Sequence, residues 1–173
     1  MTSIFTRKLS MYSYPAFYKY ISRYLNNHRQ LVNGLFIFNR LITKVMFFSY
    51  PIVVIYSLVK KMADWPMFVI VPAISFLLVT GLRKVFNARR PYEVYPINPL
   101  EKKVKAGESF PSRHVFSATM IAMVIFTVNP ILGKCYFGLA FLLAIIRVLL
   151  GVHFLRDVFA GLIIGFLAGL FLK

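Results

Sequence analysis

A short polar stretch near the end of the chain holds the residue types that could do chemistry. Residues 147–157 contain Arg147, His153 and Asp157, and they lie between two apolar runs, 135–150 and 158–172. His153 and Asp157 are four residues apart, so on a helix their side chains would share one face. A carboxylate bound to one imidazole nitrogen fixes the tautomer and makes the other nitrogen a better nucleophile. With Arg147 as a fixed positive charge, the stretch is suited to phosphoryl transfer.

This chemistry would also need an acid and more positive charge. Two further polar segments are candidates to supply them, residues 83–91 after one apolar run and residues 111–114 before another. The first is rich in Arg and Lys, and the second is Pro-Ser-Arg-His. A complete site therefore requires a fold that brings the three segments together.

The composition indicates an integral membrane protein. Of the 173 residues 59% are hydrophobic, against about 45–50% in a soluble domain, and the mean hydropathy is +0.71. The formal net charge of +16 indicates anionic lipid headgroups or a phosphorylated substrate as partners. Nucleic acid is disfavoured, because most of the chain reads as buried in lipid and RNA-binding signatures are missing. The single cysteine, Cys135, excludes an intrachain disulfide, and its apolar surroundings predict a core position.

Five apolar runs predict an all-α bundle of transmembrane helices. They cover about 41–59, 66–82, 115–129, 133–150 and 154–172. The chain is therefore one domain, 1–173, in which a basic segment, 1–40, precedes the transmembrane core, 41–173. An amphipathic period over 14–32 predicts a helix lying in the membrane interface; a soluble helix packed on a loop is the alternative. A stripe of small residues typical of close helix packing is formed by Gly161, Gly165 and Gly169.

Alternation of the five spans places the polar segments on one side of the membrane. The end of the second span, the start of the third and the turn between the last two all fall there. Ionisable groups at membrane depth are costly and usually functional. The groups that converge are Arg83, Lys84, Arg89, Arg90, Ser112, Arg113, His114, Arg147, His153 and Asp157.

Each group has a simpler explanation when it is taken alone. Arg83 and Lys84 could be ordinary flanks of a span, and Ser112 could cap a helix. His153 and Asp157 could be a structural pair that closes a hairpin. These explanations would have to hold independently at three sites, which favours a functional cluster. Two histidines and one carboxylate could also bind a metal, but the surrounding arginines would repel a cation, so we expect no metal.

Together the segments resemble the type 2 phosphatidic acid phosphatases, membrane lipid phosphatases related to the vanadium haloperoxidases. The first motif of this family is Lys, six residues, then Arg-Pro, and here Arg83 stands at the Lys position before Arg90-Pro91. Arg83 keeps the charge but changes its reach, so Lys84 is an alternative for this role. The second motif is Pro-Ser-Gly-His, here residues 111–114 with Arg113 at the Gly position, where it is a candidate further clamp.

The third motif of the family is Ser-Arg, five residues, His, three residues, Asp. Here it is Ile146-Arg147, then His153, then Asp157, so that one hydroxyl is lost but no catalytic group. The resemblance covers about residues 66–173. The family core often has six spans, and here the interfacial helix stands where a further span would be.

The resemblance implies a hydrolase that acts on a lipid phosphate or diphosphate and needs neither a metal nor any other cofactor. His153 would attack phosphorus to give a phosphohistidine, Asp157 would hold its imidazole, and His114 would protonate the leaving oxygen and then activate water. The residues that would bind phosphate are Arg83, Arg90, Ser112, Arg113 and Arg147. Phosphatidic acid, phosphatidylglycerophosphate and undecaprenyl diphosphate all fit, and the last is slightly favoured because the small chain resembles bacterial members.

Two indications about the membrane side of the site conflict. The family usually works on the extracytoplasmic face, here of a bacterial plasma membrane, and we expect that orientation. The positive-inside rule would instead make the motif side cytoplasmic. The basic residues outside the motifs that favour this are Lys19, Arg23, Lys102, Lys103 and Lys105.

Two other functions are compatible with parts of the sequence. A phosphotransferase would use the same motifs and pass the phosphoryl group to another lipid or a sugar instead of water. A non-enzymatic basic membrane protein that binds anionic lipid would not need His114, His153 and Asp157 together, so the complete set argues against it.

Overall fold

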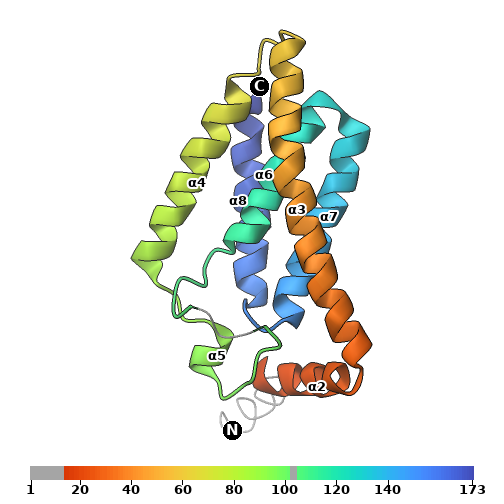
Figure 1. Cartoon of the computed structure of the whole chain (residues 1–173). Coiled ribbons are helices and arrows are strands. Elements are labelled where there is room, and N and C mark those ends of the chain that lie inside the picture. Colours follow the sequence, from red (N-terminus) through yellow and green to blue (C-terminus); the bar gives the residue numbers. More distant parts are fainter. Residues whose placement is uncertain (1–13, 102–104) are drawn as a thin grey trace, which may run out of the picture.

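The computed structural model describes residues 14–101 and 105–173 and confirms the predicted all-α class. The long helices run side by side, while the first helix lies across one end of the bundle (Figure 1). In chain order the elements are α2 (Tyr14–Asn27), α3 (Arg29–Val59), α4 (Met67–Phe86), α5 (Pro91–Val94), α6 (Arg113–Val128), α7 (Pro130–Leu149), α8 (Leu155–Gly169) and the 3₁₀ turn η2 (Leu170–Leu172).

Five apolar helices form the bundle, as predicted. Within the described residues, 4 helical segments are long and apolar enough to cross a membrane, namely Arg29–Val59, Met67–Val94, Pro130–Leu149 and Leu155–Leu172. The fifth, α6, has 16 residues and is mostly buried among the others. Because successive helices alternate in direction, the connection from α4 to α6 and the turn from α7 to α8 lie at the same end of the bundle as α2 (Figure 1). This is the predicted side for the candidate site.

The N-terminal boundaries differ from the prediction. The amphipathic helix was expected to reach residue 32 and the first span to begin near 41. Instead α2 ends at Asn27, and α3 begins at Arg29 and runs to Val59 with Pro51 inside it. Residues 35–38 are apolar, and a continuous helix satisfies its own backbone hydrogen bonds beside the membrane. The polar residues around them therefore do not break the helix.

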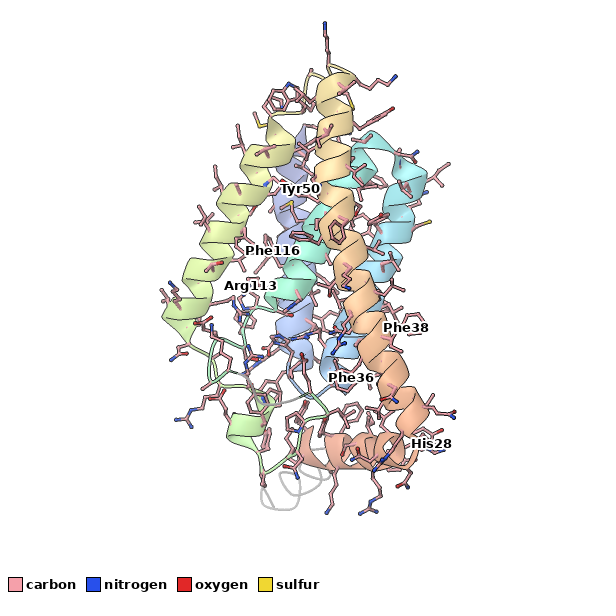
Figure 2. The ribbon with its side chains drawn as sticks, viewed as in Figure 1. His28, Phe36, Phe38, Tyr50, Arg113 and Phe116 are labelled. Carbon is pink, nitrogen blue, oxygen red and sulfur yellow. The ribbon has the colours of Figure 1, made fainter. Side chains whose placement is uncertain are left out.

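Large apolar side chains project outward from the bundle, as expected where lipid covers it. Phe38, Phe48 and Leu77 are exposed on α3 and α4, and Figure 2 labels Phe38 on α3. Cys135 lies on α7 and is also exposed, so the predicted core position was wrong. An apolar run has the same composition whether a residue faces lipid or the core, which is why the sequence did not separate the two.

The stripe of small residues packs α8 closely on α6, as predicted. A Cβ added at Gly161 would lie 2.8 Å from the carbonyl oxygen of Ser112, and one at Gly165 would lie 2.9 Å from that of Phe116. This close approach lets the Ser112 N–H donate to the carbonyl oxygen of Asp157 at 2.9 Å. The start of α6 is thereby tied to the first turn of α8, and each of these turns carries a predicted site residue.

Candidate active site

The predicted nucleophile lies in the turn between α7 and α8, paired with the predicted carboxylate. His153 is buried, and its Nδ1 is 3.5 Å from Oδ2 of Asp157. Asp157 sits in the first turn of α8, where the positive end of the helix dipole favours a negative charge. The backbone N–H of Phe154 donates to Oδ2 of Asp157 at 3.0 Å. The carboxylate is thus fixed on one side of the imidazole, and Nε2 is the nitrogen left to react.

Burial keeps this imidazole neutral. It lowers the pKa of His153 to about 4, and the positive charges of Arg147 and Arg90 act in the same direction, against the opposing effect of Asp157. A histidine must be unprotonated to act as a nucleophile. At neutral pH the ring is therefore in the reactive form.

Ser109 is a site residue that the sequence did not indicate. It is fully buried, its hydroxyl donates to Oδ2 of Asp157, and its Oγ is 3.4 Å from Nδ1 of His153. The Ser109 N–H donates to the carbonyl oxygen of Ala88 at 2.8 Å, which fixes the loop. A lone serine in a polar loop has no spacing signal, so only the fold could reveal this contact.

The arginines of the first motif bind the loops that carry the other two motifs. Arg83 Nη1 donates to the carbonyl oxygen of Pro111. Arg90 Nε donates to that of Gly107 at 3.1 Å, and Arg90 Nη1 donates to that of Val152 at 3.4 Å. Both guanidinium groups are buried. They therefore hold the three motifs in one cluster and place two positive charges there.

Burial also separates the two candidates for the first-motif position. Arg83 is buried and directed into the cluster, whereas its neighbour Lys84 is exposed on the outside of α4. Arg89 is exposed as well. The geometry favours Arg83, and not Lys84, as the residue that could reach a phosphate.

Acidic residues of the loop between α5 and α6 are paired with two of the arginines. Arg147 Nη1 is 3.0 Å from Oε2 of Glu101, and Arg83 Nη2 is 3.9 Å from Oε2 of Glu108. A carboxylate accepts hydrogen bonds from a guanidinium much as a phosphate does. The two acids therefore lie against groups that would otherwise bind a phosphate. Nothing in their sequence spacing relates them to the arginines.

The second motif forms the first turn of α6. Ser112 is the N-cap residue, but its side chain makes no capping hydrogen bond. Its hydroxyl is buried and has no hydrogen-bond partner among residues 14–101 and 105–173. The simpler explanation of Ser112 as a side-chain cap is therefore wrong. The first amides of a helix and an unpaired hydroxyl beside them make a suitable place for an anion.

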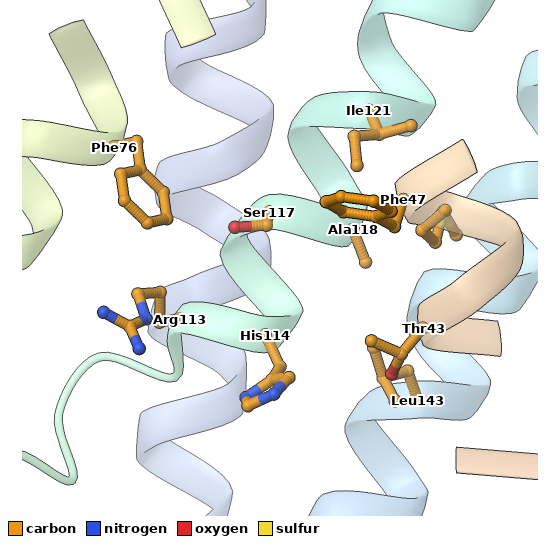
Figure 3. Close-up of a pocket in the computed structure, with 10 residues that line it drawn as sticks. Thr43, Phe47, Phe76, Arg113, His114, Ser117, Ala118, Ile121 and Leu143 are labelled. Atoms are coloured by element: carbon orange, nitrogen blue, oxygen red, sulfur yellow. The ribbon is translucent and has the colours of Figure 1, made fainter. Parts of the chain in front are cut away.

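Arg113 and His114 line a cavity of ≈ 170 Å³ between α3, α4, α6 and α7. Figure 3 shows the two side chains leaving adjacent positions of α6, with Arg113 extending toward Phe76. The Arg113 guanidinium lies 5.7 Å from the centroid of the Phe76 ring. Arg113 is thus at the margin of the buried cluster and not inside it, while His114 is exposed to the cavity.

A second cavity, of ≈ 360 Å³, lies beside the first between α3, α4 and α6. Its walls are almost entirely apolar, and Figure 2 labels two of its residues, Tyr50 on α3 and Phe116 on α6. The residues that line both cavities are Phe47, Phe76, Ser117 and Ile121. Polar and reactive groups therefore stand at one end of a mainly apolar space, which suits an amphiphilic ligand.

A family model for the PAP2 superfamily matches residues 65–173. The chain belongs to the PAP2 superfamily. The match covers the three motifs and confirms the family that they predicted. The N-terminal helix α2 and α3 precede the matched residues.

Similar proteins of bacteria include one curated relative and two solved structures. The relative is the bacitracin transport permease protein BcrC of Bacillus licheniformis, which is 31% identical over 131 residues, or 73% of this chain and 64% of the relative. The chain thus spans just under two thirds of that protein's length. The structure of LpxE from Aquifex aeolicus has a TM-score of 0.69 at 28% identity, covering 87% of this chain and 90% of that one. The structure of the first transmembrane PAP2 type phosphatidylglycerolphosphate phosphatase from Bacillus subtilis has the same fold. Its TM-score is 0.68 at 24% identity, covering 95% of this chain and 88% of that one.

Proposed function

We propose that this protein hydrolyses a lipid phosphate or an isoprenyl diphosphate at the membrane surface, with undecaprenyl diphosphate slightly favoured. The observation that carries the proposal is the buried cluster in which His153 and Asp157 meet the arginines of two separate segments, Arg83 and Arg90 from one and Arg147 from the other. Family membership and the structural likeness to a phosphatidylglycerolphosphate phosphatase support it. The preference for the isoprenyl substrate rests on the small size of the chain and its bacterial relatives.

The reaction would proceed in two steps through His153. Nε2 of His153 attacks phosphorus, so that a P–N bond forms while the P–O bond to the leaving group breaks. His114 gives its proton to the departing oxygen. Water then attacks the phosphohistidine and gives a proton back to His114. A P–O bond forms while the P–N bond breaks, so that His153 is regenerated and inorganic phosphate leaves. Asp157 holds the imidazole in the reactive tautomer throughout.

Positive charge and hydrogen-bond donors would stabilise the transferring phosphoryl group. Arg83, Arg90 and Arg147 are buried and close to the nucleophile's turn, so they act in a medium where charge is weakly screened. The unpaired Ser112 hydroxyl and the first amides of α6 would bind an equatorial oxygen. Arg113, at the cavity margin, would bind the outer part of a diphosphate. This set supplies the charge stabilisation without a metal ion.

The apolar cavities would hold the first part of the lipid chain. Both are lined by α3, α4 and α6, and His114 lines the first of them. An acyl or isoprenyl chain could remain there, in contact with the bilayer, while its phosphate enters the cluster. We place the site on the extracytoplasmic face of a bacterial plasma membrane, following the usual orientation of the family.

Phosphate release by the purified protein tests this function. Phosphatidic acid, phosphatidylglycerophosphate and undecaprenyl diphosphate should be offered in turn, with and without EDTA, beside His153→Ala. We expect release from at least one lipid, no effect of EDTA, and loss of activity in His153→Ala. Products should be analysed with added lipid acceptors, because transfer to an acceptor in place of release would show a phosphotransferase. Wild-type release by His153→Ala would refute the assignment.

A further inference from the structure

Helix α2 contacts the turn that carries His153, although α2 lies outside the residues 65–173 that match the family model. Tyr18, on its inner face, is only 1% exposed. Its hydroxyl accepts a hydrogen bond from the backbone N–H of Leu100 at 3.1 Å. Leu100 precedes Glu101, the partner of Arg147. A helix that only rested on the membrane surface would not need a buried, hydrogen-bonded tyrosine at this point.

The Tyr18 ring also covers the backbone of Gly151. Gly151 has a φ of 76°, a conformation that side chains other than glycine's rarely adopt. A Cβ at this residue would lie 2.4 Å from the Tyr18 hydroxyl oxygen and 2.5 Å from Cζ of its ring. Ring and turn are therefore in direct contact, two residues before His153.

A second tyrosine of α2 contacts the other end of the same turn. The ring of Tyr14 lies 4.9 Å from that of Phe154, edge to face. Tyr95 completes this aromatic group, with its ring centroid 5.9 Å from Tyr14 and 6.3 Å from Phe154. Phe154 directly follows His153, and its N–H binds Asp157. The aromatic side chains of α2 thus contact the turn on both sides of His153, Tyr18 at the backbone of Gly151 and Tyr14 at the ring of Phe154.

We infer that α2 is a positioning element for catalysis and that Tyr18 is the residue through which it holds the His153 turn. The inference rests on the proposed role of His153 as nucleophile. Tyr18 acts through Gly151 and is not itself in contact with the reacting atoms. Its loss would misdirect Nε2 of His153, while Arg83, Arg90 and Arg147, whose hydrogen bonds are made with other residues, would still bind phosphate.

Three substitutions in the full-length protein test this role. Tyr18→Leu removes the ring from Gly151, and kcat should fall about tenfold or more, since displacing a reacting group by about 1 Å can cost about 100-fold. KM should stay within about twofold, because the arginines bind the ground state. Tyr18→Phe restores the ring and should recover most of kcat. Tyr20→Leu is the matched control, the same change on the same helix at a side chain that is 78% exposed, and it should leave kcat unchanged.

Inhibition constants for vanadate and inorganic phosphate distinguish a misplaced His153 from a smaller amount of folded protein. Vanadate mimics the transition state and needs the nucleophile in place, whereas inorganic phosphate needs only the arginines. In Tyr18→Leu, vanadate inhibition should weaken about tenfold while phosphate inhibition stays within about twofold. Wild-type kcat and vanadate inhibition in Tyr18→Leu would overturn the inference, as would a smaller active fraction with both constants unchanged. Activity retained by His153→Ala would instead refute the proposed function, so the two failures are distinguishable.

Discussion

Replacing Glu101 by glutamine should tighten phosphate binding. In the structure the Glu101 carboxylate lies 3.0 Å from Arg147 Nη1, so an entering phosphate must compete for that guanidinium. Glu101→Gln keeps the shape of the side chain and removes its charge. The competing ion pair is weakened, and Arg147 becomes more available to the substrate.

The free energy of the Arg147–Glu101 ion pair can be estimated from how exposed its two side chains are. A hydrogen bond to a charged group contributes about 1.5–3 kcal/mol when buried, and exposed ion pairs contribute about 0.2–1 kcal/mol. The side chain of Arg147 is 7% exposed and that of Glu101 is 30% exposed, so the pair lies between these cases. A value of about 1 kcal/mol corresponds to about fivefold in affinity.

The assay is inhibition of turnover by inorganic phosphate, with KM for the lipid measured in parallel. We expect the inhibition constant to fall about fivefold in Glu101→Gln. Asp64→Asn removes the same charge at the other end of the bundle, next to the start of α4, and should leave the constant unchanged. Weaker or unchanged phosphate inhibition in Glu101→Gln would show that Glu101 does not compete for the phosphate position.

Three further predictions follow from individual side chains. Arg83→Gln should lower kcat/KM about 100-fold, in line with the loss of one donor that stabilises the transition state. Lys84→Gln changes the exposed neighbour and should leave kcat/KM within about twofold of wild type. Equal effects of the two substitutions in the phosphate-release assay would refute the choice of Arg83. The imidazole NMR signals of His153, assigned by their absence in His153→Ala, should titrate near the lowered pKa of about 4, so the ring gains its proton only below this pH; titration near the ordinary value of about 6.5 would contradict its burial. Asn98 is exposed at the site end of the bundle, so Asn98→Cys in a Cys135→Ser background reports the membrane face of the site. The new cysteine should react with an impermeant thiol reagent in intact cells, as expected for an extracytoplasmic site. Protection of this residue until the cells are lysed would place the site in the cytoplasm.

Regular patterns in the sequence predicted most of the fold and the reactive centre. The five apolar runs and their alternation placed His114, His153 and the arginines at one end of the bundle, because helix period and bilayer thickness constrain these features. The glycine stripe predicted the close packing of α8. The spacing of His153 and Asp157 predicted their pairing, which the structure confirms.

Contacts made by loops and by the N-terminal helix could not be predicted in the same way. Ser109 and Glu101 come from an irregular segment in which no period relates a residue to its partner. The packing of Tyr18 on Gly151 depends on how α2 crosses the end of the bundle, which no periodic pattern of the sequence determines. Arg113 was expected among the phosphate ligands, but its direction toward Phe76 depends on the neighbouring helix.

Trapping the phosphorylated enzyme tests the central claim most directly. The purified protein should be mixed with lipid substrate that carries ³²P in the transferred phosphate and quenched in alkali during turnover, and the labelled residue should then be mapped. The account predicts a label that is stable to alkali and labile to acid, located on His153, and absent from His153→Ala. A label on another residue, or phosphate release by His153→Ala at the wild-type rate, would contradict it.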